Sequence, residues 1–196
     1  HIIITLGTSW VYRLKESGLA VANCHKVPKH KFRKELLSIA EIIESLAVII
    51  SLIKEINPTI NFIFTVSPVR HIKDGFIENQ QSKAHLISAL HQIIKFHENS
   101  FYFPSYEIMM DELRDYRFYK EDMIHPNNIA VNYIWEKLSK KWFSDETLQT
   151  TEQIEKIQKN LDHKPFNSES LLHEKFIKST EQKIKKLQEK LPHIFF

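Results

Sequence analysis

Apolar residues along the chain recur in patterns that predict alternating strands and helices. The first pattern is a nearly continuous run, Ile2, Ile3, Ile4 and Leu6, closed by Gly7. Such a run predicts a strand that is buried on both faces, as in a parallel sheet. Because chain termini usually lie exposed and frayed, a chain that opens in its most buried strand is expected to be a fragment that lacks its N-terminal part.

The next pattern is that of a long amphipathic helix. Its apolar positions step by four and three residues and form one stripe: Phe32, Leu36, Ile39, Ile43, Leu46, Ile50 and Ile53. Asn57 and Pro58 end this helix, since the residue before a proline disfavours the helical region.

Strands and helices continue to alternate after this helix. Residues 61–68 and 101–103 are short apolar runs, each stopped by a proline, and they predict two further strands. Helices are predicted near residues 82–97 and over residues 128–143. The order strand, helix, strand, helix, strand, helix predicts a parallel α/β sheet with helices packed on it.

From residue 144 onwards the chain becomes more polar. Two weak amphipathic helices are marked there by Ile154, Ile157 and Leu161 and by Ile177, Ile184, Leu187 and Leu191. The second covers only about two heptads, fewer than a coiled coil needs. We therefore expect an α/β domain over residues 1–143 and a charged helical extension over residues 144–196. We interpret the extension as a solvated tail rather than a partner-binding arm, with a homo-oligomer through these helices left open.

Composition narrows the class of protein. The 196 residues, 42% hydrophobic and 26% charged, suit one globular domain with an appendage. The three glycines, Gly7, Gly18 and Gly75, lie too far apart for a dinucleotide fingerprint or a phosphate-binding P-loop, and we expect no cofactor. A formal net charge of +3 is too small to indicate nucleic acid as a partner.

The single cysteine, Cys24, excludes a disulfide within the chain and any zinc site built on two thiolates. A lone thiol is compatible with a reducing compartment, and a cytoplasmic location is slightly favoured. The location stays open, because any export signal is expected in the missing N-terminal part. The longest apolar run, residues 46–53, is far too short to span a bilayer. Among the 11 histidines no His-Glu-x-x-His motif occurs, and His91 and His97 lack the spacing of helical ligands, so no metal is expected.

The stretch with the clearest chemistry runs from Asp122 to Asn127, just before the last helix of the predicted sheet domain. Asp122 and His125, three residues apart on a short turn, can place a carboxylate beside an imidazole ring. The carboxylate then fixes the imidazole tautomer and stabilises the imidazolium formed during proton transfer. Pro126 stiffens the approach to the helix and Asn127 can cap it. The alternative is a surface turn with a capping role only.

Other polar residues follow the predicted strands. In parallel α/β sheets, the loops after the strands build the active site. The candidates for oxyanion or substrate binding in such loops are Gly7, Ser9, Asn23, His25, Arg70 and His71. The alternatives are loop hydrogen bonding for Asn23 and His25, and an ion pair or a helix C-terminal contact for Arg70. For Cys24, the two alternatives are a nucleophile and a small buried apolar side chain, and the second is the more common outcome.

These segments resemble the GSCFA family, which belongs to the wider SGNH (GDSL-like) hydrolases. The resemblance covers roughly residues 1–143 and leaves out the tail; it rests on residues 3–12, 21–26, 65–71, 102–107 and 122–127. It implies a flavodoxin-like three-layer α/β/α domain and serine-dependent hydrolysis or transfer of an ester or acyl group, on a lipid or an acylated glycan. It also assigns the catalytic base and its orienting carboxylate to His125 and Asp122.

Two departures from the family pattern bear on catalysis. The name-giving Gly-Ser-Cys-Phe-Ala motif, which carries the nucleophilic serine near the N-terminus, is absent from this chain. The superfamily's oxyanion-donating Asn corresponds to Ser9 here, and one such donor is often worth a few kcal/mol. A non-catalytic binding or structural protein on the same fold is therefore the alternative function. A nucleophilic role for Ser67 or Ser9 ranks last, because neither lies on a glycine-flanked elbow.

Overall fold

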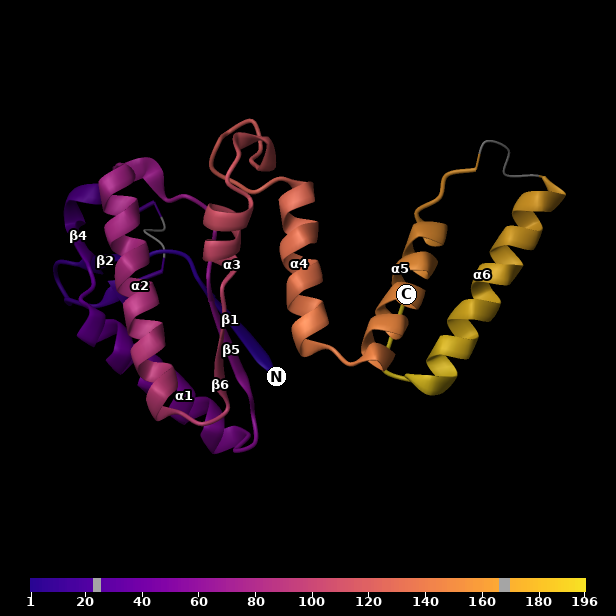
Figure 1. The fold of residues 1–196 in the computed structure, drawn as a ribbon, viewed down its shortest axis with the longest axis horizontal. Coiled ribbons are helices and arrows are strands. Elements are labelled where there is room, and N and C mark those ends of the chain that lie inside the picture. The colour runs from indigo at the N-terminus through magenta and orange to yellow at the C-terminus, as the bar shows by residue number, and fades with distance from the viewer. Residues whose placement is uncertain (23–25, 166–169) are drawn as a thin grey trace. The chain divides into compact units, whose positions relative to one another are not determined.

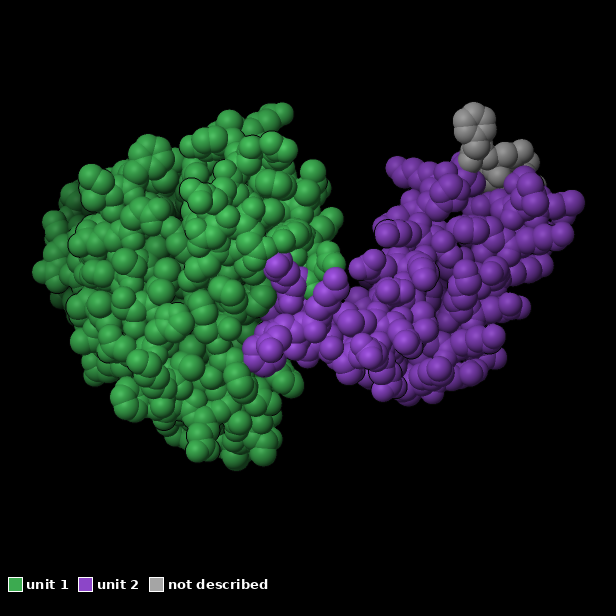
Figure 2. Space-filling model, in the orientation of Figure 1, with its two compact units in different colours: residues 1–136 green, residues 137–196 purple. Residues whose placement is uncertain are grey.

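A computed structural model describes residues 1–22, 26–165 and 170–196, and these residues form two compact units. The first is His1–Glu136 and the second is Lys137–Phe196 (Figure 2). The candidate residues Asn23 and His25 lie outside the described part of the chain.

The first unit is built on a parallel sheet of three strands. The strand order is β1 (Ile2–Leu6), β5 (Phe62–Val66) and β6 (Ser100–Phe103). The crossovers between neighbouring strands contain α1 (Ile39–Ile56) and α2 (Phe76–Phe96), as Figure 1 shows. This order confirms the expected α/β class with a parallel sheet.

The main core lies between the sheet and two helices. β5 is buried along its whole length, and its side chains Phe62, Phe64 and Val66 face the apolar stripes of α1 and α2. Those stripes contribute Ile42, Leu46 and Ile50 from α1 and Leu86, Ala89, Leu90 and Ile93 from α2. The first turns of α4 (Asn128–Trp142), which belong to the first unit, lie on the other side of the sheet in Figure 1. Helices thus flank the sheet, in agreement with a three-layer α/β/α fold.

Short elements connect β6 to α4. They are α3 (Ser105–Glu107), the π-helical turn η3 (Ile108–Glu112) and the 3₁₀ turn η4 (Tyr116–Phe118). Ser105 ties this segment to the sheet, because its hydroxyl donates to the carbonyl of Val66 at 2.7 Å. The segment that carries the Asp122–His125 turn therefore follows β6 in the chain and is anchored at the carboxyl end of the neighbouring strand β5.

The prediction that the long helix includes Phe32 and Leu36 is wrong. Residues Phe32–Leu36 form a strand, β4, beside β2 (Trp10–Leu14) and β3 (Ala20–Val21) in a small antiparallel sheet of order β3-β2-β4. Phe32 and Leu36 are spaced for one face of a strand as well as of a helix, and pairing with β2 decides between them. Two 3₁₀ turns, η1 (Lys29–Lys31) and η2 (Ile72–Asp74), complete the unit.

The helix itself begins at Ile39 because Ser38 caps it. The Ser38 hydroxyl accepts from the backbone N–H of Glu41, and the Glu41 carboxylate accepts from the backbone N–H of Ser38 at 2.8 Å. This reciprocal capping box satisfies two N–H groups at the helix start and separates α1 from β4.

The burial predicted for the opening strand is also wrong. Along β1, Ile2, Ile4 and Leu6 are half-buried, whereas Ile3 is 45% exposed. Among the described residues, β1 pairs with β5 alone and forms an edge of the sheet. The continuous apolar burial of a central parallel strand is found instead in β5.

The second unit is helical, as expected for the tail. α5 (Asp145–Leu161) and α6 (Leu171–Lys190) are capped by the hydroxyls of Ser144 and Ser170. Ile157 and Leu187 are its most deeply buried apolar side chains. No helix among the described residues combines the length and the apolar character needed to cross a bilayer.

Candidate active site

The Asp122–His125 turn forms a carboxylate–imidazole pair. Asp122 Oδ2 lies 2.7 Å from Nδ1 of His125, and Oδ1 accepts the backbone N–H groups of Ile124 at 2.8 Å and His125 at 3.0 Å. These two backbone donors, followed by the imidazole contact, lower the pKa of Asp122 to about 2. Because an ionised carboxylate can only accept, Nδ1 of His125 carries the proton and Nε2 is the basic nitrogen.

A hairpin-like loop holds this turn. The backbone N–H of Lys120 donates to the His125 carbonyl at 2.8 Å, and Tyr119 pairs with Pro126 as an isolated antiparallel bridge. Asn127 then caps α4, since its Oδ1 accepts the N–H groups of Ile129 and Ala130, each at 3.1 Å. The side chain of His125 remains 52% exposed, so the imidazole is accessible.

Arg70, from the loop after β5, fixes the same turn. Its backbone N–H donates to the Ile124 carbonyl at 3.2 Å, and its guanidinium donates to the Met123 carbonyl at 3.3 Å. The guanidinium also lies 4.3 Å from the centre of the Tyr119 ring, in a cation–π contact. Arg70 therefore joins the loop after β5 to the Asp122–His125 turn, and substrate binding by Arg70 stays a prediction.

His71 and Gly7 bring the end of β1 to the same edge. The two residues are in close contact, because a Cβ added to Gly7 would lie only 3.1 Å from Nε2 of His71. Burial lowers the pKa of His71, and the positive charges of Lys83 and His125 lower it further. Of the predicted site residues, the structure thus gathers Gly7, Arg70 and His71 around the Asp122–His125 turn.

Lys83 of α2 ties the two strand ends together. Its ammonium donates to the carbonyl of Gly7 at 2.7 Å and to that of Ser67 at 2.6 Å. The residue is only 1% exposed, and burial lowers the pKa of its ammonium to about 8. Lys83 is therefore a buried cation that fixes the spacing between the loops after β1 and β5.

Two neighbours of Lys83 hold the same loops. Asn79 Oδ1 accepts the backbone N–H of His71 at 2.8 Å. Ser82 Oγ accepts the backbone N–H of Ser9 at 2.8 Å, while the Ser9 hydroxyl donates to the Ser82 carbonyl at 3.1 Å. The Ser9 hydroxyl is thus buried against α2, and its proposed contact with substrate has no support from this geometry.

Asn79, Ser82 and Lys83 are not among the site residues that the sequence predicts. A signal was available, because these positions continue the buried stripe of Leu86 and Leu90 towards the start of the same helix. Polar residues on the buried face of an amphipathic helix need partners in the interior. Here the partners are the backbone groups of the loops that surround the turn.

The remaining predictions concern metal binding and nucleophiles. Within the described residues, no group of three or more His, Cys, Asp and Glu side chains could hold a metal ion. Ser67 Oγ accepts the backbone N–H of Val69 at 3.2 Å, which is an ordinary loop contact. Neither Ser9 nor Ser67 has a hydrogen bond to His125 in the described part of the chain.

The fold and this edge define an α/β protein with an Asp–His pair beyond the carboxyl ends of its parallel strands. A sequence profile of the GSCFA family matches residues 1–138, and the chain belongs to that family. Residues 154–196 match the profile described as GSCFA domain protein, C-terminal domain, so the helical tail is also part of the family pattern. No curated protein and no solved structure matches the chain significantly.

Proposed function

We propose that this protein is a serine-dependent hydrolase of the SGNH type that acts on an ester or acyl group of a lipid or an acylated glycan. The observation that carries the proposal is the contact between Asp122 and His125, beside the loops after β1 and β5. A carboxylate that orients an exposed imidazole is the arrangement that general-base catalysis requires.

In this proposal, Nε2 of His125 takes the proton of a serine hydroxyl as its oxygen attacks the acyl carbon. Asp122 keeps the proton on Nδ1 and stabilises the imidazolium. The imidazolium then returns a proton to the leaving alcohol, and water releases the acid in a second cycle. The nucleophilic serine is proposed to lie outside these 196 residues, which agrees with the burial of Ser9 against α2.

The oxyanion and substrate contacts are proposed for the loops around the turn. Gly7 and His71 lie there in close contact. Asn23 and His25 remain candidates in the connection between β3 and η1. Arg70 contributes by holding the turn.

The test is ester turnover by the intact protein and by its His125→Ala variant. We expect turnover of chromogenic acyl esters to fall by several orders of magnitude, and Asp122→Asn to lower it about 10⁴-fold because the tautomer is wrong. His30→Ala, at an exposed histidine of η1, is the matched control and keeps full turnover.

Unchanged turnover in His125→Ala refutes the role of His125. If the intact protein also resists a serine-reactive phosphonate, a non-catalytic function replaces the proposed one.

A further inference from the structure

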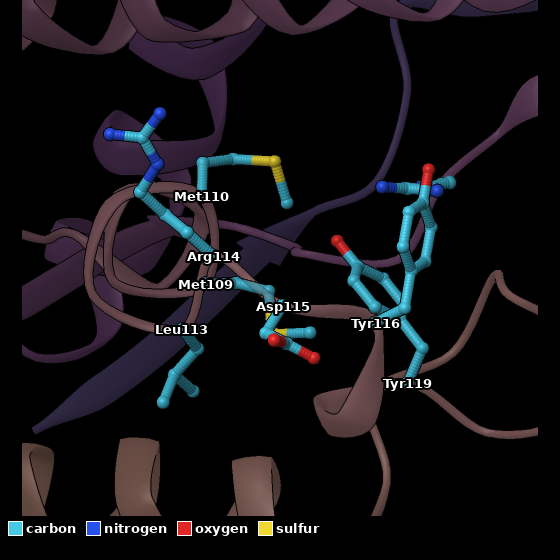
Figure 3. A pocket seen from close by; sticks show the side chains of 8 residues that line it. Met109, Met110, Leu113, Arg114, Asp115, Tyr116 and Tyr119 are labelled. Atoms are coloured by element: carbon cyan, nitrogen blue, oxygen red, sulfur yellow. The ribbon is translucent and has the colours of Figure 1, made fainter.

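A cavity of about 240 Å³ lies in the segment that leads from β6 to the Asp122–His125 turn. Figure 3 shows the side chains that line it. Its lining includes the apolar side chains Met109, Met110 and Leu113 of the segment after β6. Figure 3 shows Met110 and Arg114 on one side and the rings of Tyr116 and Tyr119 on the other. The cavity is therefore mainly apolar and aromatic, with a guanidinium group at its wall.

Two residues connect the cavity to the turn. Tyr119 lines the cavity and is also the bridge partner of Pro126, which follows His125 directly. Arg70 lines it too, while its guanidinium reaches the Met123 carbonyl inside the turn. A ligand in the cavity therefore lies next to the loop that carries the imidazole.

The charges around the cavity favour an anion. Arg70 contacts an aromatic ring and a carbonyl, which leaves its positive charge uncompensated by a carboxylate among the described residues. Arg114 has no ion pair or hydrogen bond to another described residue. The one carboxylate in the lining, Asp115, is paired with Arg117 at 3.1 Å.

The volume indicates the size of the group that this open cavity can surround. A water molecule occupies about 30 Å³ in the liquid, so about 240 Å³ accommodates about eight non-hydrogen atoms of that size. A six-carbon carboxylate has this number of atoms. Its apolar carbons match the methionine and leucine side chains, and its carboxylate matches the guanidinium groups.

We propose that this cavity binds an amphipathic organic anion, a carboxylate with an apolar body of about six carbons. The substrate assignment rests on the proposed function: the anion is the acid released when the ester is cleaved. In the neutral ester, only the apolar lining of the cavity contacts the acyl group, so it favours esters whose acyl chain is apolar.

The three methionines of the chain make the proposal directly measurable. Met109 and Met110 line the cavity, whereas Met123 lies on the turn with its side chain largely exposed. With ¹³C-methyl methionine labelling, each gives one signal, assigned by replacing each Met with Leu in turn. Titration with hexanoate is expected to shift the Met109 and Met110 signals and to leave Met123 unshifted.

Neutral and charge-deleted controls test the recognition of the anion. Hexanamide has the same shape without the charge and is expected to bind about tenfold more weakly, the loss of about one charge-assisted hydrogen bond. Arg114→Gln, at an exposed residue, is expected to weaken hexanoate binding several-fold. Arg33→Gln, at an arginine of β4 paired with Glu35, is the matched control and leaves the affinity unchanged.

The proposed anion site is refuted if hexanoate shifts neither the Met109 nor the Met110 signal, or if the Met123 signal shifts as much as these two. It is also refuted if hexanamide binds as tightly as hexanoate. Binding is measured without turnover, so the two proposals fail separately. Hexanoate binding in a protein without esterase activity refutes the proposed function alone, and esterase activity without hexanoate binding refutes the cavity alone.

Discussion

The buried ammonium of Lys83 makes the stability of this protein depend on pH above neutrality. Burial lowers the pKa of Lys83 from its ordinary 10.5 to about 8. Between these two values the unfolded chain binds more protons than the folded chain does, so the free energy of unfolding rises as the pH rises. The cost of keeping the ammonium charged in the interior is fully present below pH 8 and disappears towards pH 10.5.

The size of the effect follows from the gap between the two pKa values. At about 1.4 kcal/mol for each pKa unit, the gap between 10.5 and about 8 corresponds to about 3.5 kcal/mol. Over the accessible part of the window, from about pH 7 to about pH 9.5, we expect Lys83 to add about 2 kcal/mol to the free energy of unfolding.

Urea denaturation of the wild type and of Lys83→Met measures this contribution. The charge of Lys83 also acts on His71, but burial is the main cause that lowers the pKa of His71 below 6.5, so His71 titrates below this pH range. The difference between the unfolding free energies of the two proteins above about pH 7 therefore reports on Lys83. We expect this difference to change by about 2 kcal/mol in favour of the wild type from about pH 7 to about pH 9.5. Lys95→Met, at an exposed lysine of the same helix, is the matched control and shows no such change. A difference that stays constant with pH for Lys83→Met refutes the burial of a charged ammonium at this position.

Three further predictions concern the turn and its surroundings. Gly7→Ala places a methyl group 3.1 Å from Nε2 of His71, so we expect the ring to move and its imidazole NMR signals to shift while the fold is kept; unshifted signals contradict the close contact. Ser38→Ala removes the capping box of α1 and is expected to lower the free energy of unfolding by about 1 kcal/mol in urea, whereas no loss means that the cap is dispensable. The carboxyl carbon of Asp122 is expected to titrate near pH 2 in carboxyl ¹³C NMR, and a midpoint near 3.8 contradicts the backbone hydrogen bonds. The stability that Asp122 contributes is accordingly present above pH 3.8 and lost as the pH falls through about 2.

Much of the fold follows from local patterns. The mostly apolar run Phe62–Val66 and the helical stripe of Ile39, Ile43 and Ile50 predict their elements correctly, because apolar positions show which side of an element meets the core. The contact between Asp122 and His125 could also be predicted from the sequence. A three-residue spacing on a turn allows the two side chains to meet, so the sequence predicts their contact.

The tertiary structure decided the features that depend on distant partners. Phe32 and Leu36 suit a helix as well as a strand, and only pairing with β2 makes them a strand. The stripe of α2 points to a buried Lys83 but not to its partners, because these are the carbonyls of Gly7 and Ser67, 76 and 16 residues away in the chain.

The sequence by itself therefore determined most of the elements and the Asp–His pair, which are set by interactions between near neighbours in the chain. The fold alone decided which residues surround that pair. Every residue has a backbone carbonyl and every residue except proline a backbone N–H, so the pattern of side chains does not show which of these groups a buried ammonium or hydroxyl will meet.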